Sequence, residues 1–115
     1  MEALKGNQKL LHEAVENYFE LAEKENFRER EYTHFRQVEA GHHRIEKREV
    51  WTIPVSSLPG LPKQELWTGL STIVMLKSER KLGNKTTQEV RFYVSSLPNN
   101  AEIIAKAIRS HIKSG

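Results

Sequence analysis

The 115-residue sequence predicts one α+β domain, residues 1–115, in which a strand and a β-hairpin form an antiparallel sheet flanked by N-terminal and C-terminal helices. Apolar residues recur at three- and four-residue spacing near both ends of the chain, which indicates two amphipathic helices. Two strand-like segments meet at Gly83-Asn84, a dipeptide suited to a tight hairpin turn. Because strands bounded by helices favour a layered α+β arrangement, we expect both helices on one face of the sheet.

The first helix is expected to begin after Gly6, with Asn7 as its N-cap, and to end near Asn26. Its apolar stripe consists of Leu11, Ala14, Val15, Tyr18, Leu21 and Ala22. Glutamates occupy the opposite side, which should face water. From Phe27 to Ala40 the apolar periodicity is lost within a mixed-charge cluster, so this stretch is predicted to be a loop.

A half-buried strand is predicted from His42 to Pro54, because apolar and charged residues alternate along it. The odd-numbered positions include Ile45, Trp51 and Ile53, and the even-numbered positions include Arg44, Glu46 and Arg48. In this strand the neighbours His42 and His43 would point to opposite faces. Prolines and a glycine break the segment that follows, where a one-turn helix over residues 63–69 is an option.

The hairpin joins Thr72–Leu82 to Thr86–Leu97. If Leu82 faces Lys85, the register sets Ile73 against Val94, Met75 against Phe92 and Lys77 against Val90, which gives one face an apolar inner half. Asn100 is then expected to cap a last helix. The apolar stripe of that helix comprises Ile103, Ile104, Ala107, Ile108 and Ile112.

The composition excludes several classes of protein. There is no cysteine, which rules out disulfides and thiolate zinc sites, and we expect a cytoplasmic protein. No apolar run approaches the roughly 20 residues that cross a bilayer, and the N-terminus lacks the pattern of a secretory signal, so no membrane partner is expected. The net charge of +3 favours nucleic acid only weakly.

Motifs for catalysis or cofactor binding are missing from the sequence. The five histidines contain no pair at the i, i+4 spacing of a helical metal site. There is also no G-x-S-x-G turn and no glycine-rich phosphate loop. We therefore predict no catalytic residue, no metal ligand and no cofactor bound by this chain.

Basic residues crowd the middle of the chain. Arg44, Glu46 and Arg48 would share one strand face at intervals of about 6.8 Å, and further Lys and Arg residues lie nearby in the sequence. Such a row is either a solvated ladder of charges or a surface that contacts phosphates. The residues alone leave both readings open.

Three stretches, in matching order and spacing, together resemble one family. They are Ala3-Leu4-Lys5-Gly6-Asn7-Gln8, Gly41-His42-His43-Arg44-Ile45-Glu46-Lys47-Arg48-Glu49 and Arg91-Phe92-Tyr93-Val94-Ser95-Ser96-Leu97-Pro98. They look like the A-L/V-K-G-N-Q, G-H-G-R-I-E-x-R and R-Y-Y-I-S-S-L blocks of the H-repeat-associated transposases, a branch of the DDE insertion-sequence enzymes. The resemblance covers nearly the whole chain, and it departs from the family at His43, where glycine is usual.

The resemblance implies part of an RNase H-like catalytic domain with its β-rich insertion, which helps to contact transposon-end DNA. In the complete enzyme, two aspartates and a glutamate hold Mg²⁺ or Mn²⁺ for DNA cleavage and strand transfer. The family's aspartates lie upstream of the first block, so neither is present here. Its glutamate falls within R-x-H-W-x-I-E-N, of which Arg109-Ser110-His111 match the start, but Ile112 replaces the Trp and Gly115 stands at the Glu.

The chain is therefore expected to be a remnant of a truncated gene or a piece of a longer protein, derived from a transposase but catalytically incomplete. Its remaining role would be DNA contact within DNA-mediated transposition. The residues expected to make that contact are Lys5, His42, Arg44, Glu46, Lys47, Arg48, Arg80 and Arg91. Glu46 as a substitute metal ligand is a weaker reading, because a strand Glu between two Arg is better explained by ion pairing. The alternatives to DNA contact are a small interaction module that forms a homodimer and a free-standing nuclease.

Overall fold

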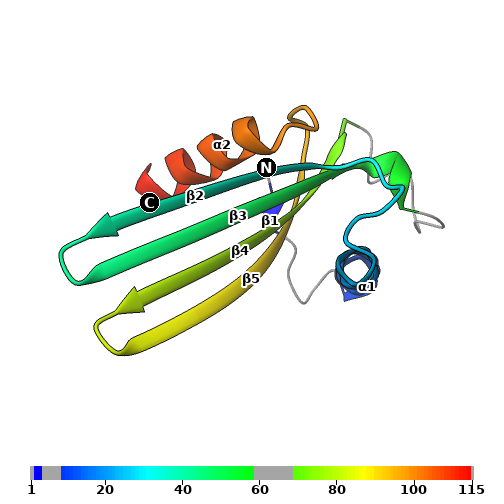
Figure 1. Ribbon diagram of the computed structural model, residues 1–115. Helices are drawn as coiled ribbons and strands as arrows, with labels where there is room; N and C mark the ends of the chain where they lie inside the picture. Colours follow the sequence, from blue (N-terminus) through cyan, green and yellow to red (C-terminus); the bar gives the residue numbers. More distant parts are fainter. Residues whose placement is uncertain (1, 4–8, 59–68, 115) are drawn as a thin grey trace.

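The computed structural model describes residues 2–3, 9–58 and 69–114 (Figure 1). In chain order the elements are β1 (Glu2–Ala3), α1 (Lys9–Lys24), β2 (Thr33–Gly41), β3 (Arg44–Pro54), the 3-10 turn η2 (Val55–Ser57), β4 (Thr72–Leu82), β5 (Lys85–Ser95) and α2 (Ala101–Ser114). The fold is α+β, with the two helices flanking an antiparallel sheet, as the sequence predicts. No helix in the described part of the chain has the length and apolar character needed to cross a membrane.

The sheet has the strand order β1-β5-β4-β3-β2, and every neighbouring pair is antiparallel. The predicted hairpin β4–β5 has the predicted register, since Ile73 faces Val94, Met75 faces Phe92 and Leu82 faces Lys85. Gly83, the first central residue of its turn, has a φ of 57°, which is the conformation that the favoured two-residue hairpin turns require at that position. A second hairpin, β2–β3, lies beside it.

One face of the sheet packs against α1. Val15, Phe19 and Ala22 of α1 are fully buried there, on a sheet surface that includes Ile73 and Phe92. Phe19 is missing from the stripe predicted for this helix, whereas Leu21, which was assigned to the stripe, is 50% exposed. The buried set recurs at four- and three-residue spacing, so the helix is rotated slightly from the expected orientation. We call this side the α1 face.

The other face packs against α2. Ile104 and Ile108 of α2 are buried against a separate cluster that contains Val50, Val74 and Leu76. Asn100 caps the helix as predicted, because its Oδ1 accepts hydrogen bonds from the backbone N–H groups of Glu102 and Ile103 at 3.0 and 3.2 Å. The stripe prediction is wrong at Ile103, which is 43% exposed. We call this side the α2 face.

The expectation that both helices share one face of the sheet is therefore wrong. α1 and α2 lie on opposite faces, as Figure 1 shows. The reason is visible in β4, whose first five residues are all buried, Thr72 and the run Ile73-Val74-Met75-Leu76. A strand that is apolar at consecutive positions must be covered on both sides, because successive side chains point to opposite faces.

The loop predicted for residues 27–40 is also wrong in its second half, which forms β2. Half-buried and exposed residues alternate strictly from Thr33 to Glu39. The half-buried positions include the polar Gln37 and Glu39, so the sequence shows no matching alternation of apolar and polar residues. β2 is the edge strand of the sheet, where polar side chains are tolerated. The connection before it, residues 25–32, contains the mixed-charge cluster that suggested a loop.

β3 begins at Arg44 rather than His42. His42 and His43 form the turn between β2 and β3, and their rings lie 4.3 Å apart, so they do not point to opposite faces of a strand. His43 has a φ of 58°, a region that glycine occupies more easily than residues with a Cβ. This is the position where the resemblance expects glycine. The predicted N-cap Asn7 and the predicted turn of helix over 63–69 lie outside the described residues, apart from Gly69.

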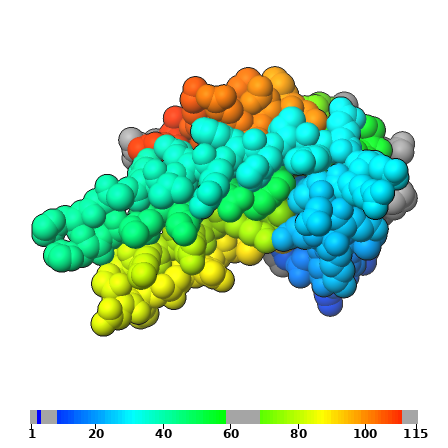
Figure 2. All heavy atoms as spheres, in the orientation of Figure 1, coloured from blue at the N-terminus to red at the C-terminus, as the bar shows by residue number. Residues whose placement is uncertain are grey.

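Both hairpin turns lie at the same end of the sheet, and Gly83 N–H donates a hydrogen bond to the His43 carbonyl at 3.2 Å. Residues 36–49 and 77–90 therefore form one four-stranded projection, which we call the arm (Figures 1 and 2). The arm holds eight Lys and Arg residues and five Glu residues, a net +3 that equals the net charge of the whole chain. The remaining residues therefore sum to zero.

Candidate nucleic-acid interface

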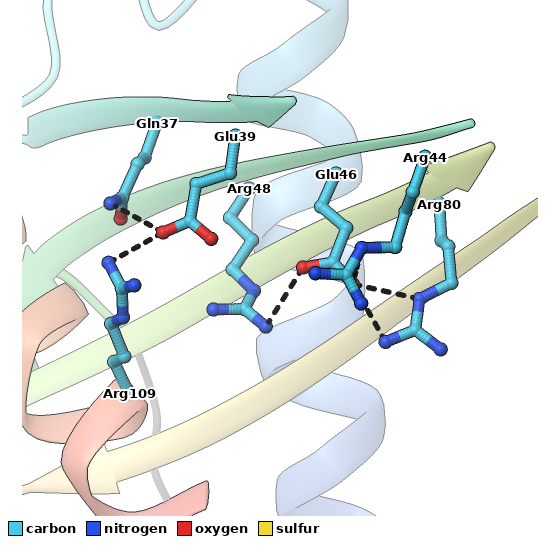
Figure 3. Close-up of polar contacts among 7 residues, drawn as sticks. All are labelled: Gln37, Glu39, Arg44, Glu46, Arg48, Arg80 and Arg109. Atoms are coloured by element: carbon cyan, nitrogen blue, oxygen red, sulfur yellow. Dashed lines mark hydrogen bonds and ion pairs between the residues drawn. The ribbon is translucent and has the colours of Figure 1, made fainter. Parts of the chain in front are cut away.

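An arginine cluster lies on the α2 face of the arm. Arg44, Glu46 and Arg48 alternate along β3, so their side chains share one face, as predicted. Arg80 on β4 is the Cα partner of Glu46 across the ladder. The sheet register therefore brings three guanidinium groups to one carboxylate (Figure 3).

Glu46 lies at the centre of this cluster. Its Oε1 accepts a hydrogen bond from Arg80 Nε at 3.0 Å, and Arg80 Nη2 forms an ion pair with the same oxygen at 2.7 Å. Arg44 Nε lies 3.9 Å from the same oxygen, and Arg48 Nη2 lies 3.9 Å from Oε2. One negative charge thus faces three positive charges, which leaves the cluster with a surplus of two.

The carboxylate lies beneath the guanidinium groups. The Glu46 side chain is 14% exposed, whereas those of Arg44 and Arg80 are 52% and 54% exposed. The hydrogen bond from Arg80 lowers the pKa of Glu46, burial opposes this shift, and the charges of Arg44, Arg80 and Arg48 lower the pKa further. Glu46 is therefore ionised at neutral pH, and the surface presented to solvent is mainly guanidinium.

Two further arginines extend this surface. Arg109 of α2 reaches Glu39 of β2, with Nη1 at 2.6 Å from Oε1, and Gln37 Nε2 donates to the same Glu39 oxygen at 3.1 Å (Figure 3). On β5, Arg91 pairs with Glu89. An open groove on this side is lined by Arg48, Arg80, Arg91 and Tyr93, and also by Glu46 and Glu89. The α2 face thus gathers five arginines from three strands and a helix.

The opposite face of the arm differs in its chemistry. Its cations are mostly lysines in one-to-one pairs, since Lys47 lies 3.9 Å from Glu79 and Lys77 pairs with Glu23 of α1. Its arginine, Arg36, lies 4.0 Å from Glu49. Lys47, predicted to contact DNA together with Arg44 and Arg48, therefore lies on the opposite face of the sheet from them, because it is at an odd position along β3.

The remaining predicted contact residues have different positions. Arg80 joins the cluster, and Arg91 lines the same groove. His42 lies in the turn at the tip of the arm rather than on a strand face. Lys5 lies outside the described residues. The sequence reasoning missed Glu39 and Arg109 as neighbours of the cluster, because residues 33–41 were not expected to form a strand.

A metal centre has no support among the residues that the structure describes, where no three His, Cys, Asp or Glu side chains come together. The sequence also contains no aspartate, since all 15 acidic residues are glutamates. The pair of aspartates that the resemblance associates with Mg²⁺ or Mn²⁺ therefore has no counterpart here. Glu46 does not fit the part of a metal ligand, because three guanidinium groups surround its oxygens.

Comparison with known proteins adds one relative. No family model and no solved structure matches the sequence. The chain is 35% identical over 95 residues to a protein of Xanthobacter autotrophicus described as an uncharacterized protein in the dhlA 3′ region. The match covers 82% of this chain and 30% of that protein, so the chain spans less than a third of the length of this relative.

Proposed function

We propose that this chain is part of a DNA transposase related to the H-repeat-associated DDE enzymes, and that the α2 face of the arm contacts DNA. The observation that carries the proposal is the surplus of two positive charges where Arg44, Arg48 and Arg80 surround Glu46. Three of these four residues belong to the Gly41–Glu49 stretch that resembles the family. In that resemblance, this part of the enzyme is an insertion that helps to contact transposon ends.

Arginine is suited to such a contact. Its guanidinium group is planar, always charged and presents N–H donors in a fork that matches the oxygens of a phosphate. The arm also projects from the rest of the molecule, which gives a long polymer access to it (Figure 2). Contacts of this kind position a protein on the DNA backbone without reading its sequence.

The chemistry of transposition would be supplied by residues that this sequence does not hold. Cleavage by paired metal ions needs three carboxylate ligands in one place, and among the residues that the structure describes no such group of acidic side chains comes together. We propose that the chain contributes DNA positioning within a longer polypeptide or assembly, without a catalytic centre of its own.

Fluorescence anisotropy with a labelled duplex tests the proposal. Replacing Arg44 and Arg48 by Gln removes two phosphate contacts, so the slope of log affinity against log salt should fall by about 1.8, which is two contacts at about 0.9 each. The matched control replaces Arg36 of β2 and Lys47 of β3 by Gln, which removes the same charge from the α1 face of the arm. That control should keep most of the affinity.

Two results contradict the proposal. Absence of binding to any duplex at about 50 mM salt, where backbone contacts are strong, removes DNA as the partner. Equal losses in the two double variants would mean that overall charge, rather than the α2 face, governs the interaction.

A second candidate is a self-associating interaction module. It is favoured by three exposed apolar side chains on the α1 face of the arm, Val38, Ile45 and Val90, which are 51%, 40% and 49% exposed. The adjacent β2 is an edge strand, and its outer backbone groups pair with no other strand in the described part of the chain. Light scattering over a range of protein concentrations separates the candidates, since a dimer that dissociates on changing Val38 to Lys favours self-association.

A further inference from the structure

Glu46 is an unexpected residue for a surface that binds an anion. It places a negative charge at the centre of the arginine cluster, where it weakens the attraction for phosphate. It is also less exposed than any of the three arginines around it, so a ligand approaching from solvent meets their guanidinium groups first. The Glu46 carboxylate can nevertheless contribute to binding by fixing the positions of the three arginines around it.

The geometry shows how it arranges them. Arg80 Nε donates a hydrogen bond to Glu46 Oε1, and Arg80 Nη2 forms an ion pair with that oxygen. Arg44 lies near the same oxygen, and Arg48 lies near the other one (Figure 3). Three like charges on long side chains would otherwise repel each other and sample many rotamers. With the carboxylate in place, the three guanidinium groups stay together, and each has five N–H donors of which Glu46 takes at most two.

We propose that Glu46 is a positioning residue that holds Arg44, Arg48 and Arg80 in a preorganised site for a phosphodiester group of a polynucleotide backbone. The inference rests on the proposed DNA contact and deepens it, because it assigns the ligand to the phosphate and a role to the carboxylate. A preorganised site binds more tightly because the entropy of ordering its side chains is lost on folding rather than on binding.

The proposal predicts a change in affinity opposite in sign to the one that charge alone predicts. Glu46→Gln raises the net charge by one, which should tighten binding if only charge matters. We expect instead a loss of affinity of roughly threefold to tenfold, because the guanidinium groups lose their anchor. The matched control is Glu79→Gln, which removes a negative charge from the same region of β4 on the α1 face. We expect it to leave affinity unchanged or to raise it.

A second variant keeps the charge constant. Arg80→Lys replaces the fork that bonds Glu46 by a single ammonium group, and it also weakens a direct contact of Arg80 with phosphate. It is therefore compared with Glu46→Asp, which leaves all three arginines in place. We expect a loss of about the same size as in Glu46→Gln. Circular dichroism confirms that each variant is folded, and if Glu46→Gln does not fold, Arg80→Lys and Glu46→Asp decide the question. Both keep the net charge, and unchanged affinity in both would overturn the inference.

The outcomes separate this inference from the proposed function. If the wild-type chain binds no duplex DNA, the proposed function fails and the inference fails with it. If the wild type binds and Glu46→Gln tightens binding as much as Glu79→Gln does, DNA contact stands and the positioning role is wrong.

Discussion

Replacing Asn100 by Ala should destabilise the protein measurably, because it removes the N-cap of α2. The side chain satisfies two backbone N–H groups, those of Glu102 and Ile103, at 3.0 and 3.2 Å. Loss of such a cap costs about 1 kcal/mol. For a domain of this size that corresponds to a fall in melting temperature of about 5 °C. Thermal unfolding followed by far-ultraviolet circular dichroism measures it.

Two control variants isolate the cap from other effects. Asn100→Asp keeps the acceptor oxygen and adds a charge that favours a helix N-terminus, so it should melt within about 1 °C of wild type or above it. Asn100→Gly should cost only a few tenths of a kcal/mol, since glycine is accepted at this position. An Ala variant as stable as wild type, or an Asp variant as unstable as Ala, would refute the assignment of Asn100 as the cap.

Three further predictions follow from packing, backbone conformation and charge. Ile104→Ala should lower the free energy of unfolding in chemical denaturation by about 2–5 kcal/mol, because Ile104 is fully buried. Ile103→Ala, at an exposed position, should change it by less than about 0.5 kcal/mol. Similar losses in both variants would contradict the packing of the Ile104 side of α2 against the sheet. Gly83→Ala should lower the free energy of unfolding by about 1 kcal/mol, because Gly83 has a φ of 57°. His43→Gly should raise it by about 0.5 kcal/mol, because His43 has a φ of 58°. Changes of the opposite sign would contradict the two turn conformations. The pKa of Glu46 is lowered in the folded state from its ordinary value of 4.5. The stability that the ionised form contributes is therefore present above that value and is lost as the pH falls through the folded pKa. The stability difference between wild type and Glu46→Gln should therefore shrink below about pH 4, and a difference that is constant down to pH 2 would contradict the ion pairing.

The parts of the fold that could be predicted are those encoded locally. The register of β4–β5 follows from a two-residue turn containing glycine and from the alternation of residues on either side of it. The start of α2 follows from Asn100 at a capping position before an apolar stripe. The shared face of Arg44, Glu46 and Arg48 needs only the two-residue period of a strand.

The parts that could not be predicted depend on neighbours far apart in the sequence. In the arm, the half-buried positions of β2 are the polar Gln37 and Glu39, whereas its apolar Val38 is exposed, so β2 has no apolar alternation to mark it. Without β2, the sequence gives no sign of the β2–β3 register or of the contact between Arg109 and Glu39. The opposite placement of the two helices did have a signal, the unbroken apolar run Ile73–Leu76, which indicates a strand covered on both sides.

Nuclear magnetic resonance of the arginine side chains tests the central claim most directly. Titration of a short duplex into labelled protein should shift the Nε–Hε resonances of Arg44, Arg48 and Arg80, on the α2 face, while that of Arg36, on the α1 face of the same arm, stays in place. Shifts confined to Arg36 and its neighbours, or no shift at low salt, would contradict the claim that this arginine cluster is the surface that contacts DNA.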